Sequence, residues 1–164
     1  MFPSGRLATA VVVAVAALLV IYVVYLETSL PGSVTTPMPS GFTINGKTYT
    51  FTYVATTEAE REAGLMNRQV NSTTTMLFAF PSFEHWQFWM YDTNTSLDII
   101  WVNGTGSSGK VVYLVAGAAP CVNVISSSSC TVYTPTAAAN FAIEAKAGFA
   151  AANGITVGST INFG

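Results

Sequence analysis

Twenty consecutive residues near the N-terminus, from Leu7 to Leu26, carry no charge and are mostly aliphatic. As an α-helix with a rise of ~1.5 Å per residue, this run is about 30 Å long, which matches the hydrocarbon core of a bilayer. Arg6 precedes the run and Glu27 follows it. The positive-inside rule therefore predicts a single-pass anchor at 7–26 with a cytoplasmic N-terminus, residues 1–6, and an extracellular C-terminal part.

A secretory signal peptide is the alternative interpretation of the same run. Its apolar region normally covers about 7–15 residues and ends in small residues at the cleavage site. The run here is longer and ends in Tyr25-Leu26-Glu27. This ending favours a retained membrane anchor, or an uncleaved signal, over a cleaved one.

The composition changes sharply after the apolar run. Residues 27–41 contain Pro31, Pro37 and Pro39 among Ser, Thr and Gly, which predicts a partly extended stalk. Residues 42–164 remain as one extracytoplasmic domain, which is long enough to bury a core of its own. Only six residues of the chain are basic and its net charge is −2, so we expect no nucleic-acid partner.

Short segments with β-strand patterns dominate the domain. Phe42–Val54 alternates apolar and polar residues around Asn45-Gly46, which predicts a hairpin with Phe42 and Ile44 on one face and three aromatic residues, at 49, 51 and 53, sharing another. Thr57 and Glu60 have the spacing of a capping box for a short helix that Gly64 ends. Further strands are expected at 75–80, 86–91, 98–103, 110–115, 140–146 and 160–163, and a helical turn at 149–153.

Many strands, short turns and brief helices favour a mostly β fold. We expect a single jelly-roll-like sandwich or a small barrel with one or two short helices. Cys121 and Cys130 are the only cysteines, and outside the cytoplasm they predict one disulfide rather than a metal site. Three N-x-S/T sequences are candidate glycosylation sites on the extracellular side: Asn71, Asn94 and Asn103.

Several blocks of the domain together resemble an uncharacterised prokaryotic family, the domain of unknown function 192. The resemblance covers 47–163 and implies a compact, mostly β domain with no assigned activity. The sequence departs from the family pattern at Tyr91-Asp92, Ser96 and Ser159. The matching blocks are Thr57-x-x-Glu60-Arg61-x-x-Gly64-Leu65-Met66-x-Arg68, Met76-Leu77-Phe78-x-Phe80, Phe88-Trp89-Met90-x-x-Thr93, Leu97-Asp98-Ile99-Ile100, Val111-Val112, Pro120-Cys121, Cys130-x-x-Tyr133, Phe141-x-Ile143-Glu144-x-x-x-Gly148 and Gly154-Ile155-x-Val157-Gly158.

Two acidic residues, Asp98 and Glu144, lie within apolar strand-like segments. Because a buried carboxylate requires a cation or hydrogen-bond donors, we expect Arg61 and Arg68 to pair with them and to fix the helix and loops onto the sheet. In the alternative interpretation, Asp98 and Glu144 form an acid/base pair or a cation site of a hydrolase-like enzyme, with His85 nearby. The other interpretation of His85 is a solvent-facing loop residue.

The stretch from Met76 to Asn103 holds all three tryptophans, and alternate members of its aromatic run must face opposite sides of a sheet. We therefore predict a ligand-binding groove near Trp86 and Trp89, with Arg61 and Arg68 as further candidate binding residues.

These features together predict a non-enzymatic, membrane-anchored binding domain of the cell envelope, without a cofactor or bound metal. Residues 7–26 contact the membrane, and the partner is a glycan, a peptide or another envelope protein. The low charge and the Ser/Thr-rich surface leave a structural alternative open, a subunit of a surface layer or filament that pairs at sheet edges.

Overall fold

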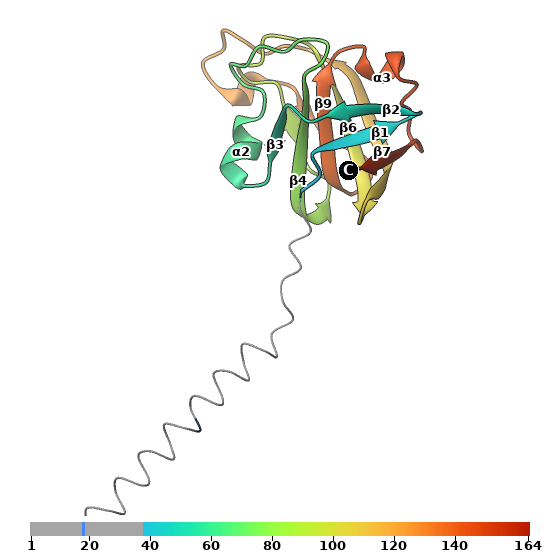
Figure 1. Ribbon diagram of the computed structural model, residues 1–164. Coiled ribbons are helices and arrows are strands. Elements are labelled where there is room, and N and C mark those ends of the chain that lie inside the picture. Colours follow the sequence, from blue (N-terminus) through green and yellow to red (C-terminus); the bar gives the residue numbers. More distant parts are fainter. Residues whose placement is uncertain (1–17, 19–37) are drawn as a thin grey trace, which may run out of the picture. The chain divides into compact units, whose positions relative to one another are not determined.

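The computed structural model describes Leu18 and residues 38–164 of the chain (Figure 1). The expected anchor at 7–26, apart from Leu18, and residues 27–37 of the expected stalk lie outside the described residues. In the part of the chain that the structure describes, no helix has the length and apolar character to cross a membrane.

Eight strands form one continuous sheet in the order β2-β1-β10-β7-β6-β9-β4-β3, and two short strands, β5 and β8, pair separately. The sheet curls into a half-barrel (Figure 1). The predicted mostly β fold with short helices is confirmed, and the small barrel is nearer to the structure than two stacked sheets. The elements are β1 (Gly41–Ile44), β2 (Lys47–Thr50), β3 (Tyr53–Ala55), α2 (Glu58–Ala63), β4 (Thr75–Glu84), β5 (Phe88–Trp89), β6 (Leu97–Thr105), β7 (Ser108–Ala118), the 3-10 turn η1 (Ser127–Ser129), β8 (Val132–Tyr133), β9 (Ala139–Lys146), α3 (Phe149–Ala152) and β10 (Thr160–Phe163).

The hairpin of β1 and β2 turns at Asn45-Gly46, as predicted. Both turn residues have positive φ, +48° and +78°, which is the backbone conformation of a tight hairpin turn. Phe42 and Ile44 are each only 1% exposed. One detail of the prediction is wrong: Tyr53 does not continue the face of the hairpin aromatics, because β2 ends at Thr50 and Tyr53 begins a new strand that packs against the other side of the sheet.

The two faces of the sheet bury separate apolar clusters. Along β6, Ile100 and Val102 belong to the cluster beside β1, β10 and α3, whereas Ile99 and Trp101 belong to the cluster on the side of β5. Residues 97–102 are all buried, because β6 lies between β7 and β9 and is covered on both faces. A strand in this position is expected to be nearly continuous in apolar residues, so Asp98 is an exception that requires an explanation.

Asp98 is saturated by backbone donors. Its Oδ1 accepts from the Gly117 amide at 2.9 Å, and its Oδ2 accepts from the Ala150 amide at 2.8 Å. Gly117 lies in β7 and Ala150 in α3, so the carboxylate ties the central strand to a neighbouring strand and to a helix. Asp98 is therefore a structural residue.

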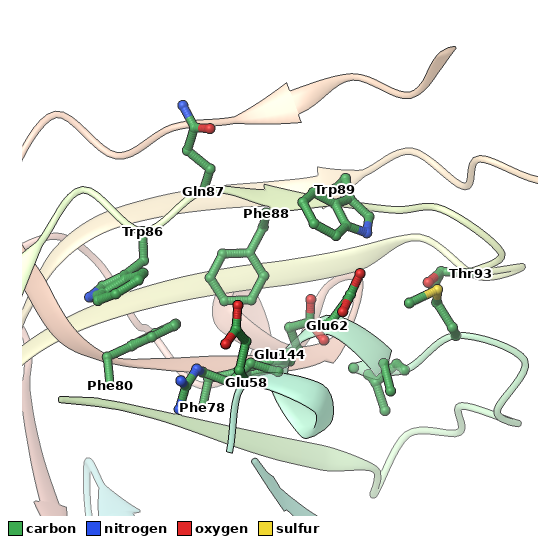
Figure 2. Close-up of a pocket in the computed structure, with 15 residues that line it drawn as sticks. Glu58, Glu62, Phe78, Phe80, Trp86, Gln87, Phe88, Trp89, Thr93 and Glu144 are labelled. Carbon is green, nitrogen blue, oxygen red and sulfur yellow. The ribbon is translucent and has the colours of Figure 1, made fainter. Parts of the chain in front are cut away.

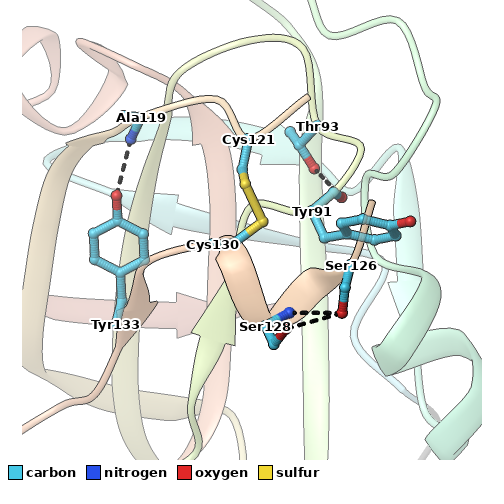
Figure 3. The surroundings of a disulfide bond; sticks show 8 residues. All are labelled: Tyr91, Thr93, Ala119, Cys121, Ser126, Ser128, Cys130 and Tyr133. Carbon is cyan, nitrogen blue, oxygen red and sulfur yellow. Dashed lines mark hydrogen bonds between the residues drawn. A yellow bond between two sulfur atoms is a disulfide. The ribbon is translucent and has the colours of Figure 1, made fainter. Parts of the chain in front are cut away.

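The predicted disulfide is present between Cys121 and Cys130 (Figure 3). Cys121 forms an isolated bridge with Tyr91, two residues after β5, and Cys130 lies two residues before β8. The hydroxyl of Tyr133 accepts a hydrogen bond from the Ala119 amide at 3.0 Å. The disulfide loop thus holds β8 against β5 and fixes the segment that carries Trp89.

The strand expected at 86–91 is shorter in the structure. Only Phe88 and Trp89 pair, with Tyr133 and Val132 respectively. The pairing strand β8 is two residues long and was not predicted, because so short a segment has no detectable alternation. The strands expected at 75–80, 98–103, 110–115, 140–146 and 160–163, the helical turn at 149–153 and the capped helix at Thr57 are confirmed, with small shifts of their ends.

Replacing Asp98 by Asn tests its structural role. The amide group would place an N–H donor against a backbone N–H and leave that buried donor without an acceptor, so we expect a loss of about 1–3 kcal/mol in the free energy of unfolding. Urea unfolding of the full-length chain measures this change. Asp92→Asn is the control, because Asn readily adopts the φ of +50° found at Asp92. Equal midpoints for wild type and Asp98→Asn would contradict the assignment.

Candidate functional site

A pocket of about 500 Å³ lies between α2 and the aromatic segment that includes β5 (Figure 2). Helix α2 supplies one wall, and the segment from Trp86 to Trp89 supplies the opposite one. Residues of β4 and β9 also line the pocket. Its lining residues are Glu58, Arg61, Glu62, Ala63, Gly64, Leu65, Met66, Phe78, Phe80, Trp86, Gln87, Phe88, Trp89, Thr93 and Glu144.

The aromatic wall is held by contacts between rings. Phe80 and Trp86 stack with a centroid distance of 4.4 Å and an interplanar angle of 8°. The indole Nε1 of Trp86 donates to the Ser82 carbonyl at 3.1 Å, which fixes the ring in its plane. Phe88 is buried and packs edge-on against Phe78, with 4.9 Å between the two ring centroids. Trp89 is 38% exposed, so the wall ends in an aromatic ring that solvent can reach.

The opposite wall depends on the N-terminal cap of α2. The side chain of Thr57 accepts from the Glu60 amide, and the Glu60 carboxylate accepts from the amides of Thr57 and Thr56 at 2.9 and 2.8 Å. These hydrogen bonds, the one from the Thr57 amide first, lower the pKa of Glu60 to about 2. The cap fixes the helix so that Glu58 and Glu62, one turn apart, both line the pocket.

Glu144 lies in the depth of the pocket. It is in β9, with Met76 of β4 and Ile99 of β6 as its neighbours in register, and it is 4% exposed. Its Oε2 atom is buried and has no hydrogen-bond partner among the residues that the structure describes. Burial raises the pKa of Glu144 to about 8. At pH 7 this carboxyl group is therefore mostly protonated.

Asp98 and Glu144 are not brought together. Glu144 is opposite Ile99 in the register of β6 and β9, and Asp98 is opposite Ala145. Because side chains alternate along a strand, the two acidic side chains point to opposite faces of the sheet. Consistently, Asp98 bonds to Ala150 of one core cluster, whereas Glu144 shares the pocket with Phe78 and Phe88 of the other. The carboxylate pair of the alternative, enzymatic interpretation does not exist in this structure.

The arginines do not pair with these carboxylates either, so that expectation is wrong. The Nη1 of Arg61 donates to the Thr56 carbonyl at 2.6 Å and to the Ala79 carbonyl at 3.0 Å, and its guanidinium lies over the Phe80 ring at 5.5 Å. Arg68 is outside the pocket. Its Nε donates to the Gly64 carbonyl at 3.1 Å, and its guanidinium lies 4.2 Å from the ring centroid of Tyr53.

A known protein family matches almost the whole of the domain that the structure describes. The family model DUF192, described as an uncharacterised ACR, matches residues 42–163. The chain belongs to the DUF192 family. No curated protein sequence matches it.

Two crystal structures are similar to this DUF192 domain. One is a protein of unknown function from Novosphingobium aromaticivorans, with 25% identity, a TM-score of 0.62, and coverage of 79% of this chain and 89% of that one. The other is described as a candidate transcription regulator from Sinorhizobium meliloti, with 23% identity, a TM-score of 0.61, and coverage of 75% and 90%. This second likeness concerns the fold alone.

The remaining candidate residues of the DUF192 domain lie outside the pocket. His85 is exposed, and its Nδ1 forms a hydrogen bond with the Pro135 carbonyl at 2.8 Å. Asn71, Asn94 and Asn103 are all exposed. Within residues 38–164, no three His, Cys, Asp or Glu side chains group closely enough to hold a metal ion.

Sequence reasoning identified Trp86, Trp89, Arg61 and Glu144, which all line the pocket. It assigned no role in binding to Glu58 and Glu62, although their spacing of four residues on a short capped helix already places them on one face. It also did not separate Glu144 from Asp98, because the register of β6 and β9 cannot be read from either segment alone.

Replacing Glu144 by Gln tests the unpaired buried carboxyl group. The folded-state pKa, about 8, lies above the ordinary value of 4.5, so the folded chain binds the proton more tightly. The stability that this group contributes is therefore complete below pH 4.5 and is lost as the pH rises to about 8. Glu144→Gln has no such loss. We therefore expect the unfolding free energy of the wild type to fall by about 3–5 kcal/mol more than that of the variant when the pH is raised from 4.5 to 8.5.

Urea unfolding of the full-length chain at pH 4.5, 6.5 and 8.5 measures the difference. Glu62→Gln is the matched control, because Glu62 is an exposed residue at the pocket. Parallel pH profiles for wild type and Glu144→Gln would show that the carboxyl group is paired or hydrated in the folded protein.

Proposed function

We propose that residues 42–164 form a non-enzymatic binding domain whose ligand occupies the pocket between α2 and Trp86–Trp89. The observation that carries this proposal is the buried Oε2 atom of Glu144, which has no partner within residues 38–164. A buried polar atom without a hydrogen bond costs about 1–3 kcal/mol of stability. A ligand donor that bonds to the Glu144 carboxyl group from the pocket would supply the missing partner.

The contrast with Asp98 supports a binding role. Asp98 is equally enclosed, and two backbone amides saturate it. The same sheet therefore accommodates one acidic residue at little cost and leaves the other unpaired, beside a pocket with aromatic walls. Pockets that combine apolar walls with a few polar groups are typical of ligand sites.

We further propose that residues 7–26 anchor the domain in the cell membrane, with the domain on the extracellular side and residues 27–41 as its stalk. Three features support this arrangement. The first is the uncharged run between Arg6 and Glu27. The second is the disulfide of Cys121 and Cys130, which favours an oxidising compartment. The third is the exposure of the asparagines in the three N-x-S/T sequences. The partner in the envelope would be a glycan, a peptide or another protein.

Binding is tested with the full-length chain in the non-ionic detergent octaethylene glycol dodecyl ether. A panel of 1-butylamine, 1-butanol, butyrate and methyl β-glucoside is titrated and followed by saturation-transfer NMR. We expect at least one compound to bind saturably, and Trp89→Ala to weaken that binding at least fivefold because the exposed ring lines the pocket. Phe83→Ala is the matched control, since Phe83 is 48% exposed and does not line the pocket. Failure of every compound to bind, or equal losses in the two variants, would contradict the proposal.

The membrane assignment is tested by expressing the full-length chain and washing the membranes with alkaline carbonate. We expect the chain to stay in the pellet and its mass to include residues 7–26. Leu18→Asp should move it to the supernatant, because an acidic residue near the centre of a spanning helix costs roughly 2.5–3.5 kcal/mol of insertion. Met38→Asp, outside the apolar run, is the control. A chain without residues 7–26 would support a cleaved signal instead.

A further inference from the structure

We infer that the pocket recognises an alkylammonium group, that is, a protonated amine on an apolar stem, as in a lysine side chain or a free alkylamine. This inference rests on the proposed binding function and specifies its ligand. Three features of the pocket lead to it: the charges on its walls, the aromatic rings and the unpaired atom of Glu144.

The charges that face the pocket are predominantly acidic. Its ionisable lining residues are three glutamates, at 58, 62 and 144, and one arginine, Arg61. The Nη1 of Arg61 is already bonded to two backbone carbonyls, and the guanidinium lies over the Phe80 ring. An anionic ligand would therefore meet three carboxyl groups and a single guanidinium whose Nη1 is already bonded. A cationic ligand would meet complementary charge from Glu58 and Glu62 of α2 on one side and, once Glu144 ionises, from β9 on the other.

The aromatic wall suits a cation on a short apolar stem. Trp86, Phe88 and Trp89 lie together on the side opposite Glu62 and Glu58 (Figure 2). Ring faces attract ammonium groups, and the interaction strengthens where water is excluded. Leu65, Met66 and Phe78 add apolar surface to the pocket lining, against which methylene groups would pack.

Glu144 gives the site its preference for a donor group. An ammonium ion carries N–H donors and no acceptor, so one N–H would bond to the Glu144 carboxylate, whose Oε2 atom the protein leaves unpaired. A quaternary ammonium has no such donor. The ion also compensates the charge of the carboxylate, which is costly to bury alone. We therefore assign recognition to the N–H⁺ group and not to positive charge alone.

Binding of the cation requires Glu144 in its ionised form, and this couples binding to pH. In the free protein the carboxyl group is mostly protonated at pH 7, because burial raises its pKa to about 8. The proton of Glu144 leaves to solvent when the ammonium group binds. Affinity for an amine should then increase with pH up to about 8. A neutral ligand that accepts a hydrogen bond from the protonated acid should show the opposite dependence.

The experiment compares 1-butylamine, butyltrimethylammonium, 1-butanol and butyrate on the full-length chain in the same non-ionic detergent, by NMR titration at pH 6, 7, 8 and 9. We expect 1-butylamine to bind at least tenfold more tightly than the other three at pH 8. Between pH 6 and pH 8 its affinity should increase at least tenfold, because the ionised fraction of Glu144 rises over this range. The amine itself stays protonated over this range, since its pKa is close to that of lysine, about 10.4.

Variants identify the groups responsible. Glu144→Gln should abolish the pH dependence and lower the affinity for 1-butylamine at pH 8 at least tenfold. Glu62→Gln should lower it about two- to fivefold, because a carboxylate at the pocket contributes a weaker, partly screened attraction. Glu84→Gln is the matched control, since Glu84 is exposed and lies outside the pocket.

The outcomes separate this inference from the proposed function. Tighter binding of 1-butanol or butyrate than of 1-butylamine would overturn the inference and leave the binding function intact, whereas no binding of any compound would contradict both. An affinity for 1-butylamine that is independent of pH would also overturn the inference. Comparing 1-butylamine with Nα-acetyl-lysine methylamide then distinguishes a free amine from the side chain of a peptide: tighter binding of the lysine derivative indicates a peptide partner.

Discussion

The central strands β6 and β9 are covered on both faces, and their backbone groups are used by neighbouring strands. A polar side chain on either strand must therefore find its partner from outside the sheet, or remain unpaired. Asp98 and Glu144 represent these two outcomes. Two amides from β7 and α3 reach Asp98, whereas no donor within residues 38–164 reaches the Oε2 atom of Glu144. The different roles of the two acids follow from this difference in partners.

The elements around Glu144 explain why the protein itself leaves it unpaired. Arg61 is on the adjacent helix and lines the same pocket. Its guanidinium, however, is bonded to the carbonyl groups of Thr56 and Ala79 and lies over the Phe80 ring, and it is not bonded to Glu144. Trp86 is likewise held by its bond to Ser82 and by its stacking on Phe80. Both residues thus contact Phe80, and none of these contacts involves Glu144. The space between the walls remains open, and the carboxyl group in its depth keeps its hydrogen-bonding capacity.

Local structure was predictable from the sequence wherever a few adjacent residues determine it. Asn45-Gly46 specified its turn, and Thr57 with Glu60 specified the start of α2, because the atoms that bond are close in the chain. Features that depend on pairing between distant segments were not predictable. The register that sets Glu144 beside Ile99 joins residues 45 positions apart (144 − 99), and it decides which face each acid occupies. The arginines were assigned to carboxylates on charge alone, while backbone carbonyls closer to them proved to be their partners.

The two ends of the described domain are tied to each other by hydrogen bonds. The amides of Ser40 and Gly41 donate to the Gly164 carbonyl at 2.7 and 3.0 Å, and the Gly164 amide donates back to Gly41 at 3.1 Å. The strands next to them, β1 and β10, pair along Phe42 and Phe163. A domain whose two ends lie side by side can be inserted into a surface loop of another protein, because the loop residues on either side of the insertion stay close together. The same fold is therefore suited to insertion within another chain.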